Sequence, residues 1–319
     1  MTFPASSRRF QLFSYAVLAY TLAVVLWGAF VRATGSGAGC GDHWPVCNGV
    51  VIPREPTVAT MIEFTHRVTS GLAMIMAVVL CVWGLRGHAK GHPVRGASVL
   101  ALVFMLTEAA VGAGLVLLQY VADNQSIARA FWMGAHLINT FLLVGAQALT
   151  VWYASGRSKV VLRGQGLAGV LVGVVVAGVL LLGVSGAIAA LGDTLFPASS
   201  LAEGFRQDMS ETAHVLVRLR VLHPIIAVVM GAVLVAVASL LARLRPAPEV
   251  KRGATLVGVL YAVQLCAGVI NLVLLAPVWM QLVHLLLADL VWIALVRLCA
   301  AGLAEDAPRA VTQPAPVSA

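Results

Sequence analysis

Charge is scarce in this chain. Asp, Glu, Lys and Arg make up 11% of its 319 residues, whereas a soluble domain carries about 25%. Hydrophobic residues make up 60%, and the mean hydropathy is +0.94. This composition excludes a soluble globular protein and indicates a polytopic membrane protein. Acids are the scarcer charge, which leaves a net charge of +8. In so apolar a chain that excess indicates basic cytoplasmic loops and no nucleic-acid partner.

Cysteine is scarce as well, with five residues in the chain. Cys81, Cys266 and Cys299 stand alone in apolar runs, where we interpret them as packing residues. A cleavable signal peptide is also not apparent. The first apolar run, 10–31, is too long for the apolar core of a signal peptide and predicts a first membrane-spanning helix.

Eight apolar runs are long enough to cross a membrane as helices. The sequence therefore predicts an all-α integral membrane protein with eight transmembrane helices in the lipid bilayer. The segment 303–319 is rich in Ala and Pro and is predicted to be a disordered tail. We place the eight predicted spans near residues 11–32, 62–85, 96–119, 127–153, 164–190, 212–242, 254–275 and 279–301.

Basic residues mark alternate loops, before the first span and after the second, fourth and sixth spans. The positive-inside rule places these loops in the cytoplasm. Both termini are therefore predicted to be cytoplasmic, in a multi-pass protein of the cell (plasma) membrane. The basic residues are Arg8, Arg9, Arg86, Lys90, Arg95, Arg157, Lys159, Arg163, Arg243, Arg245, Lys251 and Arg252.

The chain repeats itself weakly. The segment LVLL at 115–118 recurs at 272–275, an offset of 157 residues, and the same offset carries His66 onto His223. Four spans separate equivalent positions, so the repeat is parallel rather than inverted. The sequence thus predicts two four-helix bundles, at residues 1–156 and 157–302.

Four of the eight histidines lie well inside predicted spans. Each falls in the outer half of its span at a similar depth, and each half of the chain has two. An imidazole in hydrocarbon is costly unless it is partnered or bound to a metal. A lone histidine there is usually an interhelical hydrogen bond, but four at one depth predict ligands. They are His66, His136, His223 and His284.

The other histidines lie in or beside predicted loops. His43 is in an outer loop, and His88 and His92 are in a short basic loop, so we interpret all three as solvated. His214 lies at the outer mouth of the sixth span, which favours an interfacial or supporting role.

The pairing of the four histidines predicts their ligand. Two histidines on facing helices of a four-helix bundle can bind one haem iron axially, whereas zinc would need a third or fourth ligand. No acid is repeated between the halves, which argues against a carboxylate-bridged pair of metals. Small residues at Gly71, 109–114 and 266–269 leave slots for a flat ring, although ordinary helix packing explains them equally well. We predict one haem in each half.

The segment IEFTHR, 62–67, distinguishes the first half from the second. Glu63 and His66 are three residues apart and share a helix face. The offset of 157 carries Glu63 onto Arg220, so the second half lacks this carboxylate. The asymmetry predicts a reactive first site and a second site for electron transfer or structure. The alternative is that Glu63 is an interfacial acid paired with Arg67.

Four arginines lie near the predicted outer membrane face. Haem propionates are negatively charged and need basic partners, preferably forked guanidinium groups. Snorkelling of long basic side chains would place arginines there as well. The candidates for propionate partners are Arg32, Arg67, Arg218 and Arg220.

The first outer loop, TGSGAGCGDHWPVCNG at 34–49, holds the remaining two cysteines. Cys40 and Cys47 face an oxidising compartment, where a disulfide can persist. A zinc site is weakly supported, since only His43 and Asp42 are near, and a free redox-active dithiol stays open.

Together these motifs resemble those of the haem A synthase family. The loop TGSG…C…WP.C.G is followed by EF.HR at the start of the second span, HL in the fourth, HP in the sixth and HLLLAD in the eighth. The resemblance covers all eight spans, and its first two motifs are the specific ones. It implies a membrane oxidoreductase that oxidises the C8 methyl group of haem O to a formyl group. The product, haem A, serves terminal cytochrome oxidases.

The resemblance also implies a role for individual residues. His66 and His136 would flank the substrate, haem O, and His223 and His284 would be the axial ligands of a haem b cofactor. Glu63 would be the catalytic carboxylate, either stabilising positive charge at the methyl carbon or moving protons. Cys40 and Cys47 would be the outer-loop pair, and Pro224 should kink the sixth span.

The resemblance implies partners as well. A haem O synthase, which is a farnesyltransferase, would supply the substrate. The electron donor is not identified by any motif, and a homo-oligomer stays open. Some family members have a second cysteine pair between the fifth and sixth spans, which this chain lacks.

Two other classes of protein fit part of the pattern. A di-haem b electron-transfer cytochrome, linked to quinol, would explain all four histidines but not a carboxylate in one half or the cysteine loop. A transporter built from two repeats is also compatible with the parallel repeat. Histidines in all four outer halves and the absence of broken spans argue against it.

Overall fold

A computed structural model describes residues 6–307 as helices joined by loops, with no strand in that range. Eight helical segments are long and apolar enough to cross a membrane, which confirms the predicted number of spans and the all-α class. A 3-10 turn, η1 (Ser36–Ala38), and a short helix, α6 (Leu201–Met209), lie outside the spans. The spans are α1 (Arg8–Ala33), α2 (Val58–Gly87), α3 (Pro93–Leu117), α4 (Ile127–Ala154), α5 (Leu167–Leu195), α7 with α8 (Val215–Arg220 and Leu222–Leu244), α9 (Pro248–Val273) and α10 (Val278–Gly302).

Two helices begin several residues before the predicted spans. The Thr57 hydroxyl accepts a hydrogen bond from the Thr60 N–H at 3.1 Å and caps α2. α9 begins at Pro248, whose missing N–H costs nothing in the first turn of a helix. Its first turns hold Glu249 and Lys251. An apolar run leaves out such a polar first turn, so the predicted boundary fell inside α9.

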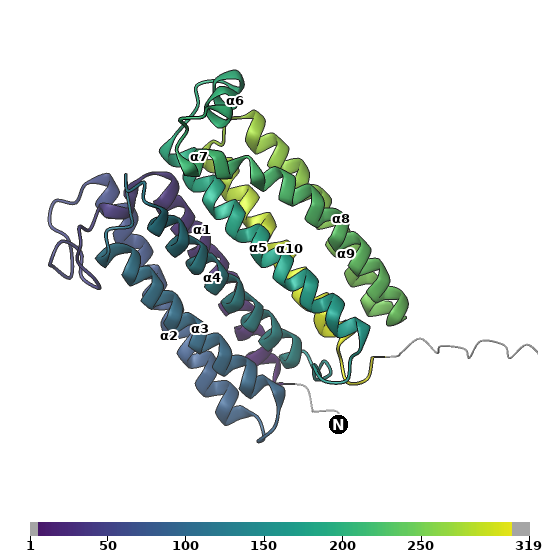
Figure 1. Cartoon of the computed structure of the whole chain (residues 1–319). Helices are drawn as coiled ribbons and strands as arrows, with labels where there is room; N and C mark the ends of the chain where they lie inside the picture. The colour runs from purple at the N-terminus through teal and green to yellow at the C-terminus, as the bar shows by residue number, and fades with distance from the viewer. Residues whose placement is uncertain (1–5, 308–319) are drawn as a thin grey trace, which may run out of the picture.

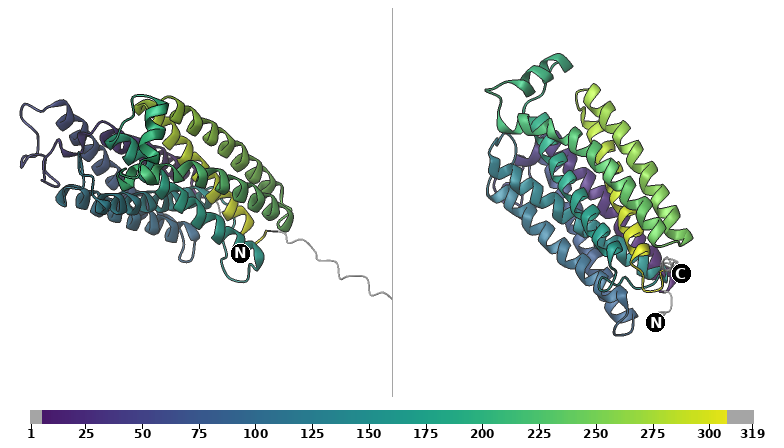
Figure 2. Two further views of the ribbon diagram at one scale, coloured as in Figure 1. Left: turned by 45° about the horizontal axis from the view of Figure 1, so that its top comes forward. Right: turned by 45° about the vertical axis from the view of Figure 1, so that its right-hand side comes forward.

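The helices form two groups of four that pack along a common seam (Figure 1). One group is α1 to α4, and the other is α5, α8, α9 and α10. Figure 2 shows the purple-to-teal group beside the green-to-yellow group, and α1 and α4 face α5 and α10 across the seam. Lipid is as apolar as these side chains, so close packing and hydrogen bonds must hold the seam together.

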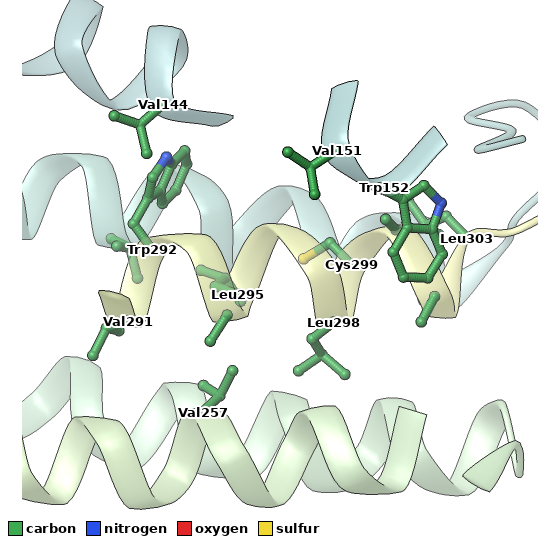
Figure 3. Close-up of a cluster of buried hydrophobic side chains, with 14 of the residues drawn as sticks. Val144, Val151, Trp152, Val257, Val291, Trp292, Leu295, Leu298, Cys299 and Leu303 are labelled. Carbon is green, nitrogen blue, oxygen red and sulfur yellow. The ribbon is translucent and has the colours of Figure 1, made fainter. Parts of the chain in front are cut away.

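α4 lies at the centre of the molecule. Of its apolar window, 72% is buried, against at most 39% in any other span. Val144 and Val151 of α4 lie on one side of α10, and Val257 of α9 lies on the other (Figure 3). Trp292 of α10 stacks on Phe141 with ring centres 5.3 Å apart, and its indole N–H donates to the Phe141 carbonyl at 2.6 Å. This packed core joins the two groups.

The sixth predicted span is not continuous, which corrects the expectation that no span is broken. α7 ends at Arg220 and α8 begins at Leu222, with Val221 between them. Pro224 has no N–H to donate to the carbonyl of Arg220, four residues earlier, and its ring crowds that carbonyl. The kink expected at Pro224 is thus present. One argument against a transporter falls, and the case against it now rests on the histidines.

The loop between α5 and α7 contains the helix α6, which was not predicted. The Ser200 hydroxyl accepts a hydrogen bond from the Glu203 N–H at 3.2 Å. Serine followed three residues later by glutamate is the sequence signature of a helix start, so SLAE at 200–203 was a usable signal. Leu201, Phe205 and Met209 all lie exposed along this helix.

The two ends of the described chain lie at the same end of the bundle. The Gln11 amide of α1 donates to the Ser155 hydroxyl after α4 at 2.9 Å. Residues 303–307, assigned above to the tail, run beside the loop after α4, where the Val161 N–H donates to the Leu303 carbonyl at 2.9 Å. The rest of the predicted disordered tail lies outside the described residues.

His92 differs from the expectation of a solvated loop residue. Its side chain is 4% exposed and accepts a hydrogen bond from the Val94 N–H at 3.2 Å, which caps α3. His88 stacks against it with ring centres 4.6 Å apart and lies 2.6 Å from the Ser6 hydroxyl. Histidine can act as an N-cap acceptor, a role that loop composition does not reveal.

Candidate functional site

The four predicted ligand histidines lie at a similar depth, six to nine residues inside the predicted outer ends of their spans. At 1.5 Å per residue this is about 9–14 Å along a helix. His66 is on α2 and His136 on α4, whereas His223 is on α8 and His284 on α10. Each half therefore presents two histidines from two different helices.

In the second half the two imidazoles face each other. The ring centres of His223 and His284 are 6.4 Å apart, and the ring planes are 88° apart. An imidazole nitrogen lies about 2 Å from a bound metal, so rings on opposite sides of one ion have centres roughly 6 Å apart. The Ser185 hydroxyl lies 2.9 Å from Nδ1 of His223, and the Gln264 amide lies 3.3 Å from Nε2 of His284. The spacing suits two ligands on one metal.

In the first half, His66 lies on α2 and His136 lies on α4. Nδ1 of each of these two histidines is buried and has no hydrogen-bond partner. The same is true of Nδ1 of His284. A buried imidazole nitrogen without a partner is costly. These three rings therefore lack a protein hydrogen bond at Nδ1, and a ligand bound at the other ring nitrogen would fix their orientation.

Glycines make room for these histidines. A Cβ atom on Gly28 would lie 2.9 Å from Cε1 of His66, and one on Gly186 would lie 3.0 Å from Cε1 of His223. On Gly268 it would lie 3.1 Å from Cε1 of His284. Any larger residue would push these rings away. Gly71 differs from these three glycines. A Cβ there would meet nothing within 4 Å and so would crowd no histidine.

The metal-binding side chains present suit a metal ion that a cofactor already coordinates with most of its ligands. No group of three or more His, Cys, Asp or Glu side chains within residues 6–307 is arranged to hold a metal ion. Zinc takes three or four protein ligands, whereas the iron of haem needs one or two axial ones. Two facing histidines against flat glycine backbone therefore fit a haem.

Glu63 lies near the N-terminal end of α2, the predicted outer end, and is 3% exposed. Its Oε1 accepts hydrogen bonds from Nη2 of Arg67 at 2.5 Å and from Nε at 3.2 Å. Its Oε2 accepts the Cys40 N–H at 2.8 Å. Nη1 of Arg67 donates to the carbonyls of His43 and Val46, each at 2.6 Å. Glu63 and Arg67 therefore form an ion pair that also fastens the outer loop to α2.

Cys40 and Cys47 form a disulfide, which confirms the predicted pair. Both are buried, and the Asn48 N–H donates to the Cys40 carbonyl at 3.0 Å. The Thr60 hydroxyl of α2 donates to the Gly39 carbonyl at 2.8 Å. The disulfide loop is thus held against the outer end of the helix that carries Glu63 and His66.

Arg32 reaches across the seam. Its Nη1 donates to the Ala190 carbonyl at 2.8 Å and to the Thr194 hydroxyl at 2.7 Å, both on α5. Its Nη2 donates to Oε1 of Gln281 on α10 at 2.8 Å. This side chain connects the two halves, so a role as propionate partner stays a prediction beside a structural role.

The other outer arginines are also engaged with the protein. Nε of Arg220 donates to Asp208 at 2.6 Å, and its Nη1 lies 3.5 Å from Asp193. Arg218 donates to the Glu211 carbonyl. With Arg67 in its ion pair, all four predicted propionate partners have protein acceptors, and a propionate would share them.

Arg129 was overlooked because it lies inside the fourth apolar run. It is buried, and its Nη1 donates to the carbonyls of Ala122 at 2.5 Å and Asn124 at 2.8 Å. Its Nε is buried without a hydrogen-bond partner. Arg129 precedes His136 by seven residues, two helical turns, and so lies above it on the same face of α4. A charged residue within a span was the available signal.

Two acids inside spans were not among the predicted site residues. Glu108 of α3 lies with Oε1 3.6 Å from Nδ1 of His136 and accepts hydrogen bonds from Asn139 and Thr140. Asp289 of α10 is 0% exposed, and neither carboxyl oxygen has a hydrogen-bond partner. Glu63 and Glu108 give the first half two carboxylates near its histidines.

The fold and the site define a polytopic membrane protein with two histidines inside the spans of each half, and the pair in the second half has the spacing of two ligands on one metal. Residues 11–296 match the sequence model of the family described as cytochrome oxidase assembly protein. The chain therefore belongs to this family, the haem A synthase family.

The known relatives that the chain resembles have two different names. Two proteins, from two strains of Thermus thermophilus, are each called protoheme IX farnesyltransferase. Both are 52% identical over 270 residues, which cover 85% of this chain and 44% of the relative. The heme A synthase of Exiguobacterium sibiricum is 36% identical over 133 residues, 42% of this chain and 43% of the relative. The chain thus spans less than half the length of the curated relatives it matches.

Proposed function

We propose that this protein catalyses the haem A synthase reaction, the oxidation of the C8 methyl group of haem O to the formyl group of haem A for terminal oxidases. The net change replaces two hydrogens by one oxygen. With water as the oxygen source, four electrons and four protons leave for an external electron acceptor. The observation that carries the proposal is a histidine pair in each half, with carboxylates beside the first pair. Family membership supports haem as the class of substrate.

The two halves have different tasks in this proposal. Residues 1–156 bind haem O between His66 and His136, and residues 157–302 bind haem b between His223 and His284. The ring separation of 6.4 Å supports an axial pair in the second half. Haem b supplies reversible one-electron transfer when it is bound. The halves are proposed to be a parallel repeat, because a glycine of the first helix in each half backs the histidine of the second.

Glu63 is the proposed catalytic carboxylate. It shares a helix face with His66, and its hydrogen bonds with Arg67 and the Cys40 N–H hold it in one place. A fixed negative charge can stabilise positive charge that develops at the methyl carbon, or it can accept a proton released there. The disulfide loop covers the same helix end and keeps water from it.

The proposed partners are haem O, haem A and a farnesyltransferase that makes haem O. The Thermus relatives are named for the farnesyl step, and more than half of each lies outside the matched region. The basic end of the bundle, with the two ends of the described chain, is proposed to face the cytoplasm. The histidines then lie nearer the outer surface of the cell membrane.

Haem analysis of cells tests the proposed reaction. The chain is expressed with and without a haem O synthase, and haems are extracted from the purified protein. Haem A is expected only when haem O is available. Haem b as the sole haem under both conditions would overturn the proposal and support the di-haem b cytochrome.

Histidine variants test the assignment of the halves. Replacing His223 or His284 by Ala should remove haem b while the chain still inserts into the membrane. His66→Ala and His136→Ala should instead reduce bound haem O and leave haem b in place. Full haem b in both second-half variants would show that the halves have been assigned the wrong way round.

A further inference from the structure

Glu108 is a carboxylate within a membrane span. It lies nine residues before the outer end of α3, about 14 Å along the helix. An ionisable residue at that depth is costly and marks a functional site by default. Its Oε1 accepts the Thr140 hydroxyl at 2.5 Å, and its Oε2 accepts the Asn139 amide at 2.6 Å. These bonds from α4 hold the carboxylate in one orientation.

The Asn139 side chain is itself held from both sides. Its amide nitrogen also donates to the Phe104 carbonyl at 2.9 Å, and its oxygen accepts the Thr107 hydroxyl at 2.6 Å. Glu108 is thus the inner member of a hydrogen-bonded chain that begins with Thr107. The chain leads from the surface of α3 to His136.

His136 lacks the partner that Glu108 can provide. Nδ1 of His136 is buried without a hydrogen bond, and Oε1 of Glu108 lies 3.6 Å from it. A histidine that binds a metal through Nε2 carries its proton on Nδ1, and that N–H needs an acceptor. A small rotation of the imidazole would bring the two atoms within hydrogen-bond distance.

The four histidines differ in what faces Nδ1. His223 has the neutral Ser185 hydroxyl at 2.9 Å. His66 and His284 have no hydrogen-bond partner at Nδ1. Among the four, His136 alone faces a carboxylate. A carboxylate on the outer nitrogen makes an imidazole a stronger donor to its metal than a hydroxyl does.

We propose that Glu108 is a positioning residue that accepts the Nδ1–H of His136, turns Nε2 toward the haem site and strengthens this ligand. The proposal rests on the assignment of His136 as an axial ligand in the proposed function. A stronger donor favours ferric over ferrous iron. The haem of the first half should therefore have a lower reduction potential than it would with a neutral group at position 108.

The test is a spectroscopic redox titration of the purified protein loaded with both haems, in the wild type and in Glu108→Gln. The potential of the first-half haem should rise in the variant, and that of haem b should stay unchanged. A tenfold loss of the preference for ferric iron corresponds to about 59 mV. The first-half haem should also dissociate 10- to 100-fold more readily, roughly the range for lost outer partners of ligating histidines.

Two matched variants separate positioning from packing. Thr107→Val removes the far end of the same hydrogen-bonded chain and should leave both potentials unchanged. Ser185→Ala removes the partner of His223 and should move the potential of haem b alone. Equal shifts in Glu108→Gln and Thr107→Val would overturn the proposal, because they would indicate a general disturbance of α3 and α4.

Thr140→Val gives an independent measurement if Glu108→Gln does not retain both haems. It removes a competing donor from Oε1 of Glu108, so the first-half potential should fall rather than rise. If the first-half potential is unchanged in whichever of Glu108→Gln and Thr140→Val retains both haems, the role of Glu108 is refuted. The proposed function is not affected by that result. Wild-type protein that binds no haem in its first half refutes the proposed function itself.

Discussion

Glu63 combines two roles that the sequence presented as alternatives. It forms the ion pair with Arg67 that an interfacial acid would form, and it also accepts the N–H of Cys40. Neither contact removes it from the helix face of His66. The ion pair therefore orients the carboxylate without excluding a part in the chemistry.

A charge-removing substitution at Glu63 should slow the reaction more than it weakens haem binding. Glu63→Gln keeps the shape and an acceptor for Cys40 but loses the negative charge. Loss of one preorganised charge interaction of about 3 kcal/mol slows a step roughly a hundredfold. We expect haem b and bound haem O at wild-type levels with little haem A, as measured by extraction and chromatography of haems.

Arg67→Gln is the matched control for this prediction. It breaks the ion pair and the bonds to the outer loop but leaves the carboxylate in place. Haem A should fall less than in Glu63→Gln. Equal losses of haem A in the two variants would indicate that Glu63 only holds the loop against α2 and has no part in the chemistry.

At the scale of elements, the approach of neighbouring helices decides where each histidine points. Gly186 of α5 lies against the imidazole of His223, and Gly28 of α1 lies against the imidazole of His66. In both places a backbone without a side chain lies against an imidazole. Helices in lipid pack most closely at such small residues, so glycine sets the position of the ring.

Adding one methyl group to α5 should therefore disturb haem b. Gly186→Ala places a Cβ 3.0 Å from His223, and such overpacking costs about 1–3 kcal/mol. We expect haem b content to fall severalfold, with an altered Soret band in what remains. Gly173→Ala, on the same helix with nothing within 4 Å of the new atom, should bind haem b normally. Normal haem b in both variants would contradict the role given to Gly186.

The outer loop after α1 depends on its disulfide. Cys40 and Cys47 are seven residues apart, and closing so short a loop stabilises a fold by about 2–3 kcal/mol in the chain-entropy account. Mass spectrometry of unreduced peptides should find the two cysteines linked. Replacing both by Ser should lower the midpoint of thermal unfolding and reduce haem A while leaving haem b in place. Two alkylatable thiols in freshly prepared, unreduced protein would count against a structural disulfide.

At the scale of the whole molecule, the distribution of charge predicts orientation. The basic loops after α2, α4 and α8 lie at the end of the bundle where the described chain starts and stops. The disulfide loop and α6 lie at the opposite end. The positive-inside rule then assigns the basic end to the cytoplasm.

Thiol labelling in intact cells tests this orientation. Thr212→Cys introduces a thiol before α7, and Lys159→Cys introduces one after α4, in the loops at opposite ends of the bundle. A membrane-impermeant reagent should label the first in intact cells and the second only after permeabilisation. The reverse pattern would invert the topology and place the histidines nearer the cytoplasm.

Much of the site could be predicted from sequence because it follows from burial in lipid. Apolar runs must span, and a histidine within a run is costly, so His66, His136, His223 and His284 could be proposed as ligands from the sequence. Glu108 and Arg129 carried the same signal. They were missed because, unlike the histidines, neither has a counterpart of the same type in the other half of the chain.

The sequence by itself determined the number of spans, their class and the depth of the histidines, since these depend on how each segment partitions between water and lipid. Only the tertiary structure decided which polar groups meet: Arg32 with α5 and α10 across the seam, and Glu108 with His136. A buried polar group must find its partner among whatever helices lie beside it. Those neighbours are chosen by packing of the whole bundle, which no single segment encodes.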